Sequence, residues 1–247
     1  MSLPERSLAQ AIRQQYALTM HTLGSSFYRN LICLEILFSL PIIWFSTTHG
    51  TFINQLYHLR VRFLSGSQTL WVAMAYVAAI AWVMADNRQR NMAFTFVSSR
   101  LSHDLSNMAA LFTMSGIAAV LSTLSLLLTR LAVTLISGDI ILAEGYHLTP
   151  LDLFYCMTAV FGYSLLAAAI VYLLVIILRR ESRLLAFVPL VMLLGLKVPL
   201  VGDALGDILA FYLAEPSPAF FLLKAVLTVL VLFAAACWGS KRLEVRR

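Results

Sequence analysis

The sequence predicts an all-α membrane protein with six transmembrane helices. Of its 247 residues, 60% are hydrophobic and only 12% are charged, whereas soluble domains carry about 25% charged residues. Six apolar stretches are each long enough, or nearly so, to cross a hydrocarbon core of about 30 Å as a helix. They cover residues 30–47, 70–85, 108–128, 151–178, 184–202 and 219–239. Because no soluble fold could bury so much apolar surface, the solvent must be lipid.

We expect a single transmembrane domain over residues 1–247. It would consist of an N-terminal helix at 1–29, a six-span bundle at 30–239 and a basic cytoplasmic tail at 240–247. No connection between spans, 48–69 among them, is long enough for a separate globular domain.

The distribution of basic residues predicts the orientation. Six spans put both termini on one side, and only three basic residues between the spans would lie on the other. By the positive-inside rule, both termini face the cytoplasm of the plasma membrane, in what we expect to be a bacterial cell. The residues assigned to the cytoplasmic side are Arg6, Arg13, Arg29, Arg88, Arg90, Arg100, Arg179, Arg180, Arg183, Lys241, Arg242, Arg246 and Arg247, against Arg60, Arg62 and Arg130 outside. This topology explains the net charge of +6 without a nucleic-acid partner.

The segment before the first span has the periodicity of an amphipathic helix. Polar Gln and Arg residues occupy its other faces, and Pro4 and Glu5 suit its first turn. Such a helix would lie in the membrane interface, either as an elbow that braces the bundle or as a passive anchor. The apolar residues that recur at steps of three or four are Leu8, Ile12, Tyr16, Met20, Leu23 and Phe27.

The connection between the second and third spans, residues 86–108, predicts a short cytoplasmic helix. It carries Phe94, Phe96, Val97 and Leu101 among polar residues, and exposed apolar groups of this kind usually meet another surface. That surface is either a cytoplasmic partner or the bundle itself.

The fifth span and its exit predict irregular structure. Pro189, Gly195 and Pro199 favour a kinked or broken helix. Residues 201–220 are acidic and partly apolar, which is typical of a re-entrant or interfacial segment before the sixth span.

Three ionisable residues, Glu35, Lys197 and Lys224, fall within the predicted spans. Charged groups are costly in contact with lipid, so they usually face a partner or a water-filled cavity. They are candidates for a substrate path, and the two lysines could instead reach the outer headgroups by snorkelling.

Several chemistries have no support in the sequence. There is no GxxxxGK[ST] phosphate-binding loop. All five histidines lie outside the predicted spans, and the spans contain no paired carboxylates. The three cysteines have no metal-ligand spacing. We therefore expect neither enzymatic activity nor a bound cofactor in this chain.

The layout resembles the ABC-2-type permease subunits of ATP-binding-cassette exporters. Residues 88–112, RQRNMAFTFVSSRLSHDLSNMAALF, are similar to the family's passage from the second to the third span, with the dipeptide Ser99-Arg100 in the short helix. The resemblance implies a second permease subunit, identical or related, and separate ATPase subunits that bind ATP and Mg. It implies a hydrophobic, amphiphilic or peptide substrate. The residues it suggests for ATPase docking are Phe94, Phe96, Ser99, Arg100, Leu101 and His103.

Two other classes of protein fit the same six spans. A stand-alone secondary transporter or channel would use Glu35, Lys197 and Lys224 directly. A membrane-embedded scaffold would have no transport path at all.

Overall fold

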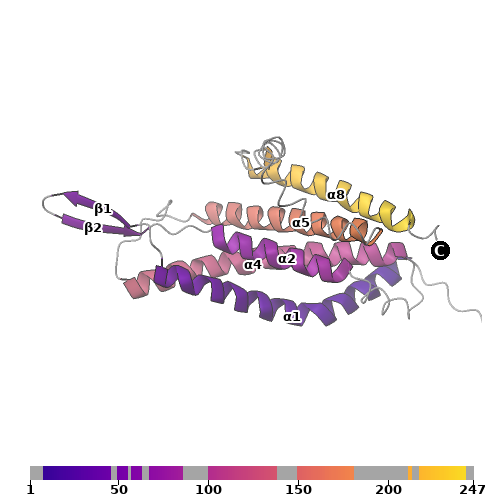
Figure 1. The fold of residues 1–247 in the computed structure, drawn as a ribbon, viewed down its shortest axis with the longest axis horizontal. Coiled ribbons are helices and arrows are strands. Elements are labelled where there is room, and N and C mark those ends of the chain that lie inside the picture. Colours follow the sequence, from indigo (N-terminus) through magenta and orange to yellow (C-terminus); the bar gives the residue numbers. More distant parts are fainter. Residues whose placement is uncertain are drawn as a thin grey trace, which may run out of the picture.

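The computed structural model of the chain describes residues 8–45, 49–54, 57–62, 67–85, 100–137, 149–180, 211–212 and 217–242. It is an elongated helix bundle with a β-hairpin projecting from one end (Figure 1). The elements, in chain order, are α1 (Leu8–Phe45), β1 (His49–Asn54), β2 (Tyr57–Arg62), α2 (Ser67–Ala85), α4 (Arg100–Ser137), α5 (Pro150–Arg180) and α8 (Pro218–Arg242).

Among the described residues, four helices are long and apolar enough to cross a membrane. These segments are Gln68–Ala85 in α2, Ser102–Ala132 in α4, Pro150–Leu178 in α5 and Pro218–Gly239 in α8. They correspond to the predicted second, third, fourth and sixth spans, as expected of a multi-pass membrane protein. Residues 30–45 of the predicted first span lie in α1, and the fifth span at 184–202 lies outside the described residues. Six spans therefore stay a prediction.

Helix α1 joins two predicted elements in one. The N-terminal helix and the first span form a single helix of 38 residues, with no break near residue 30. Its predicted apolar series packs on the bundle: Phe27 is fully buried, and Tyr16, Met20 and Leu23 pack against the core. A period of 3.6 residues identifies an apolar face without saying whether protein or lipid covers it, so the expected interfacial helix is here part of the bundle.

The connection from α1 to α2 contains strands that the sequence analysis did not predict. β1 and β2 pair in antiparallel fashion, in a register that runs from His49 opposite Arg62 to Asn54 opposite Tyr57. The hairpin extends beyond the end of the bundle, where α1 ends and α2 begins (Figure 1).

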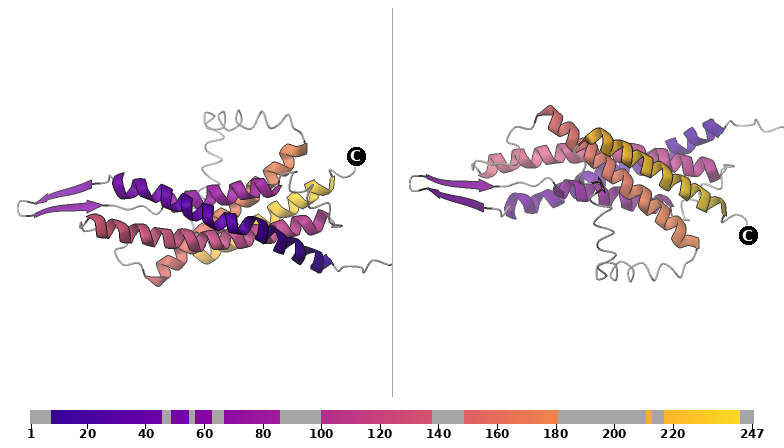
Figure 2. Two further views of the ribbon diagram at one scale, coloured as in Figure 1. Left: turned by 90° about the horizontal axis from the view of Figure 1, so that it is seen from below. Right: turned by 90° about the horizontal axis from the view of Figure 1, so that it is seen from above.

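The core lies around α5, which contacts α2, α4 and α8. Small residues let the helices approach closely, as is common between membrane helices. The buried residues shared by these interfaces include Val77, Ala81, Ala110, Met114, Ala118, Leu165, Ala168, Ala169 and Tyr172. Helices α1 and α8 lie on opposite sides of this core (Figure 2).

The direction of the helices constrains the path of the chain. Helices α5 and α8 run parallel, because Tyr163 contacts Phe221 and Tyr172 contacts Phe233 further along both. Arg180 and Pro218 therefore lie at opposite ends of the bundle (Figure 2). Helices α5 and α8 therefore begin at the same end of the bundle.

Candidate functional site

Glu35, the first candidate for the substrate path, is buried between α1 and α4. Its exposed fraction is 3%. The Ser122 hydroxyl donates to Glu35 Oε1 at 2.6 Å, and Ser125, one turn further along α4, also hydrogen-bonds to the carboxyl group. Buried carboxyl groups need such donors. In this structure Glu35 joins two helices, and it faces the second half of α4 rather than the start of that helix.

Lys224, the second candidate, lies on α8 at the other side of the bundle. Its Nζ stands 4.1 Å from the centroid of the Phe211 ring, in the geometry of a cation–π contact. The neighbouring Tyr212 shares a hydrogen bond of 2.7 Å with the Thr228 hydroxyl. Glu35 and Lys224 are therefore held at different places in the bundle. The third candidate, Lys197, lies outside the described residues.

The predicted docking residues are described only in part. Phe94, Phe96 and Ser99 lie outside the described residues, whereas Arg100, Leu101 and His103 form the first turn of α4. No break separates this turn from the rest of the helix. A displacement at residues 100–103 would therefore move a helix that extends through the whole bundle.

Sequence reasoning missed a buried polar cluster formed by Asp104, Asn107 and Tyr172. The Tyr172 hydroxyl donates to Asp104 Oδ1 at 3.1 Å and accepts from Asn107 Nδ2 at 3.5 Å. All three side chains are at most 6% exposed. Asp104 was predicted to lie in a connection before the third span, but α4 starts earlier and buries it against α5. The spacing of Asp104 and Asn107, which puts both on one helical face, could have indicated a shared partner.

The described part of the chain offers no evident metal centre. Among these residues, no group of three or more His, Cys, Asp and Glu side chains could hold a metal ion. The candidate site consists instead of helix-to-helix polar contacts within an apolar bundle.

Comparison with known proteins adds no identity. We found no match to the chain among protein families, curated proteins or solved structures. The resemblance to ABC-2-type permeases therefore rests on the sequence pattern alone.

Proposed function

We propose that this chain is the transmembrane subunit of an ABC exporter. It would form a path for a hydrophobic, amphiphilic or peptide substrate together with a second permease subunit, identical or related. Separate ATPase subunits would bind ATP and Mg and dock on the cytoplasmic side. The observation that carries the proposal is the sequence of residues 88–112, together with the direct continuation of its last part into α4.

The polar cluster supports a route for coupling. Residues 94–103 would receive the movement of the ATPase, and Asp104 follows at once on α4. The hydrogen bond from Tyr172 to Asp104 links α4 to α5, which packs in turn on α2 and α8. ATP can drive such a change only if it favours one arrangement of the permease over another. Movement of the first turn of α4 would supply that difference.

Purification of the tagged chain under mild conditions tests the proposal. We expect a cytoplasmic ATPase to co-purify in a fixed stoichiometry. The double substitution Phe96→Glu and Leu101→Glu should abolish co-purification while the chain still inserts in the membrane. Phe96→Leu with Leu101→Ile is the matched control, because it keeps both side chains apolar and should retain the ATPase. Retention of the ATPase, with normal substrate-stimulated ATP hydrolysis, by the double Glu variant would eliminate the docking role.

A stand-alone secondary transporter is the second candidate function, and Glu35 favours it. Ionisable groups buried among membrane helices often mark ion or proton pathways. In that case the chain would purify alone, and an ion gradient would drive transport in proteoliposomes. Glu35→Gln would then abolish gradient-driven transport, whereas an ABC permease needs no gradient.

A further inference from the structure

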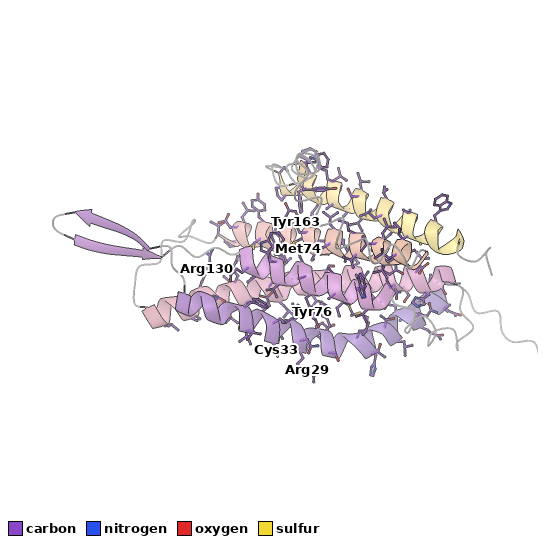
Figure 3. All side chains as sticks on the ribbon, viewed as in Figure 1. Arg29, Cys33, Met74, Tyr76, Arg130 and Tyr163 are labelled. Carbon is purple, nitrogen blue, oxygen red and sulfur yellow. The ribbon has the colours of Figure 1, made fainter. Side chains whose placement is uncertain are left out.

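The outward face of α1 carries polar residues in the middle of the helix. Thr22, Ser26, Arg29 and Cys33 are all exposed and recur at steps of three or four, so they share one face. Arg29 and Cys33 point away from the other helices (Figure 3). One turn beyond Cys33 this face becomes apolar, with Ile36 55% exposed.

Contacts with α2 establish the depth of Arg29. The ring centroid of Phe27 is 5.2 Å from that of Tyr76, and Asn30 hydrogen-bonds to Tyr76. Tyr76 is the middle residue of α2, whose apolar segment Gln68–Ala85 is about the length of the hydrocarbon core. Arg29 therefore lies near mid-membrane depth, although the sequence analysis assigned it to the cytoplasmic side.

Contacts with α4 agree with this depth. Tyr16 hydrogen-bonds to Thr113, and Glu35 accepts from Ser122. Arg29 lies between Tyr16 and Glu35 on α1, so its level on α4 falls between residues 113 and 122. That interval contains the middle of the apolar segment Ser102–Ala132.

Contact with lipid is unfavourable for this polar face of α1. An arginine near the bilayer centre is strongly unfavourable when it faces lipid, and snorkelling covers only part of the roughly 15 Å to the headgroups. Within the described part of the chain, no carboxylate pairs with Arg29. The buried carboxyl group of Glu35 is engaged by serines of α4 instead. The guanidinium therefore needs water or an anion from outside the described residues.

We propose that this face of α1 lines a water-filled cavity in which Arg29 binds an oxyanion of the substrate. The cavity extends along this face from Thr22 to near Cys33. A guanidinium is always charged, and its paired N–H donors match a carboxylate or a phosphate group. The proposal rests on the proposed transport function and narrows its substrate to compounds that carry such a group.

Cys33 provides a natural probe of this cavity, because it lies one turn from Arg29 on the same face. In the full chain with Cys156→Ser and Cys237→Ser, reconstituted in proteoliposomes, two membrane-impermeant methanethiosulfonates of opposite charge are compared. We expect both reagents to modify Cys33. Each rate is divided by the rate at which the same reagent modifies a small free thiol. After this correction, the anionic sulfonate should react faster than the cationic trimethylammonium. Arg29→Gln should lower the anion-to-cation rate ratio about tenfold, which corresponds to about 1.4 kcal/mol. This is the size expected when a unit charge attracts one reagent and repels the other across about 6 Å of water.

Two variants control the experiment. Arg29→Lys keeps the charge and should keep the rate ratio. Val120→Cys, in a chain with no other cysteine, places the probe on α4 at a similar depth, on a residue that is 45% exposed. It should react with a lipid-soluble maleimide and with neither charged reagent.

The outcomes separate the possible neighbours of the face. If Cys33 reacts only with the maleimide, as Val120→Cys should, the face lies in lipid and the proposal is wrong. If Cys33 resists every reagent and forms a disulfide with a second copy under oxidation, a protein covers the face and the proposal is again wrong.

Competition tests the oxyanion itself. Dodecanoate and dodecyl phosphate are added in turn, and at least one of them should slow the modification of Cys33 by the anionic reagent. Arg29→Gln should remove this effect. If neither slows it, or if Arg29→Gln leaves the rate ratio unchanged, oxyanion binding by Arg29 is refuted. None of these readouts needs an ATPase, so they remain interpretable if no ATPase co-purifies.

Discussion

Gly162 allows α8 to pack closely on α5, so Gly162→Ala should loosen that interface. A Cβ at this position would lie 2.5 Å from Cε1 and 2.8 Å from Cζ of Phe221, well inside the usual carbon–carbon separation of about 3.5 Å or more. The Phe221 ring is only 6% exposed, and its centroid is 4.7 Å from that of Tyr163. The ring must therefore move against packed neighbours.

The magnitude follows from two opposing terms. Overpacking of this kind costs about 1–3 kcal/mol, whereas alanine gains up to about 1 kcal/mol over glycine within a helix. We expect Gly162→Ala to lower the free energy of unfolding by about 1–2 kcal/mol. Titration with SDS in mixed micelles measures this quantity, and thermal unfolding in detergent should show a Tm lower by roughly 2–8 °C.

Two further variants decide whether the clash is the cause. Gly116→Ala is the matched control, because its Cβ would find its nearest side-chain atom, from Phe161, at 4.0 Å; it should be neutral or slightly stabilising. Phe221→Leu removes the ring and should relieve Gly162→Ala, with a coupling of about 1 kcal/mol or more in the double-mutant cycle. Equal stabilities for the two alanine variants, without coupling to Phe221→Leu, would refute the packing argument.

Three contacts at the candidate site give further predictions, each measured by the same SDS titration. Glu35→Ala should destabilise the chain by about 1–2 kcal/mol and Glu35→Gln by less, because glutamine still accepts from the serines of α4; equal losses would argue against that hydrogen bond. Tyr172→Phe should lower the free energy of unfolding by about 1–2 kcal/mol, because it removes the hydroxyl that donates to Asp104. An unchanged free energy of unfolding would mean that water replaces this hydroxyl. Lys224→Met and Phe211→Leu should each cost about 0.5–2 kcal/mol without adding in the double variant, whereas additive losses would show that the cation–π contact contributes nothing.

The apolar helices were predictable because lipid selects for composition. The predicted spans 70–85, 151–178 and 219–239 nearly coincide with the apolar segments of α2, α5 and α8, since a run of apolar residues needs no knowledge of its neighbours. The start of α4 was predicted less well. The third span was predicted to begin at Met108, but the helix begins at Arg100, and Asp104 and Asn107 are buried against Tyr172 of α5.

The polar contacts between helices could not be predicted from the sequence, because they depend on how the helices cross. Glu35 was identified as an unusual residue, but its donor Ser122 lies 87 positions away. Nothing in either segment shows that α1 and α4 meet at that level. The same limit applies to Tyr172, whose sequence surroundings are those of an ordinary membrane helix. The hairpin from His49 to Arg62 was not predicted either, since its two strands are only six residues long and are defined by their pairing with each other.

The two faces of α1 differ in how their polar groups are covered. On the side toward α4, Glu35 is satisfied by serines within the bundle. On the other side, Arg29 and its polar neighbours have no such cover in the described part of the chain, whereas α2, α4 and α8 present apolar residues such as Trp71, Leu128 and Val231 to the outside. A water-filled cavity at membrane depth must be enclosed on all sides, and a single face of α1 provides only one wall. The cavity proposed at this face of α1 therefore needs a second wall, which the proposed second permease subunit would supply.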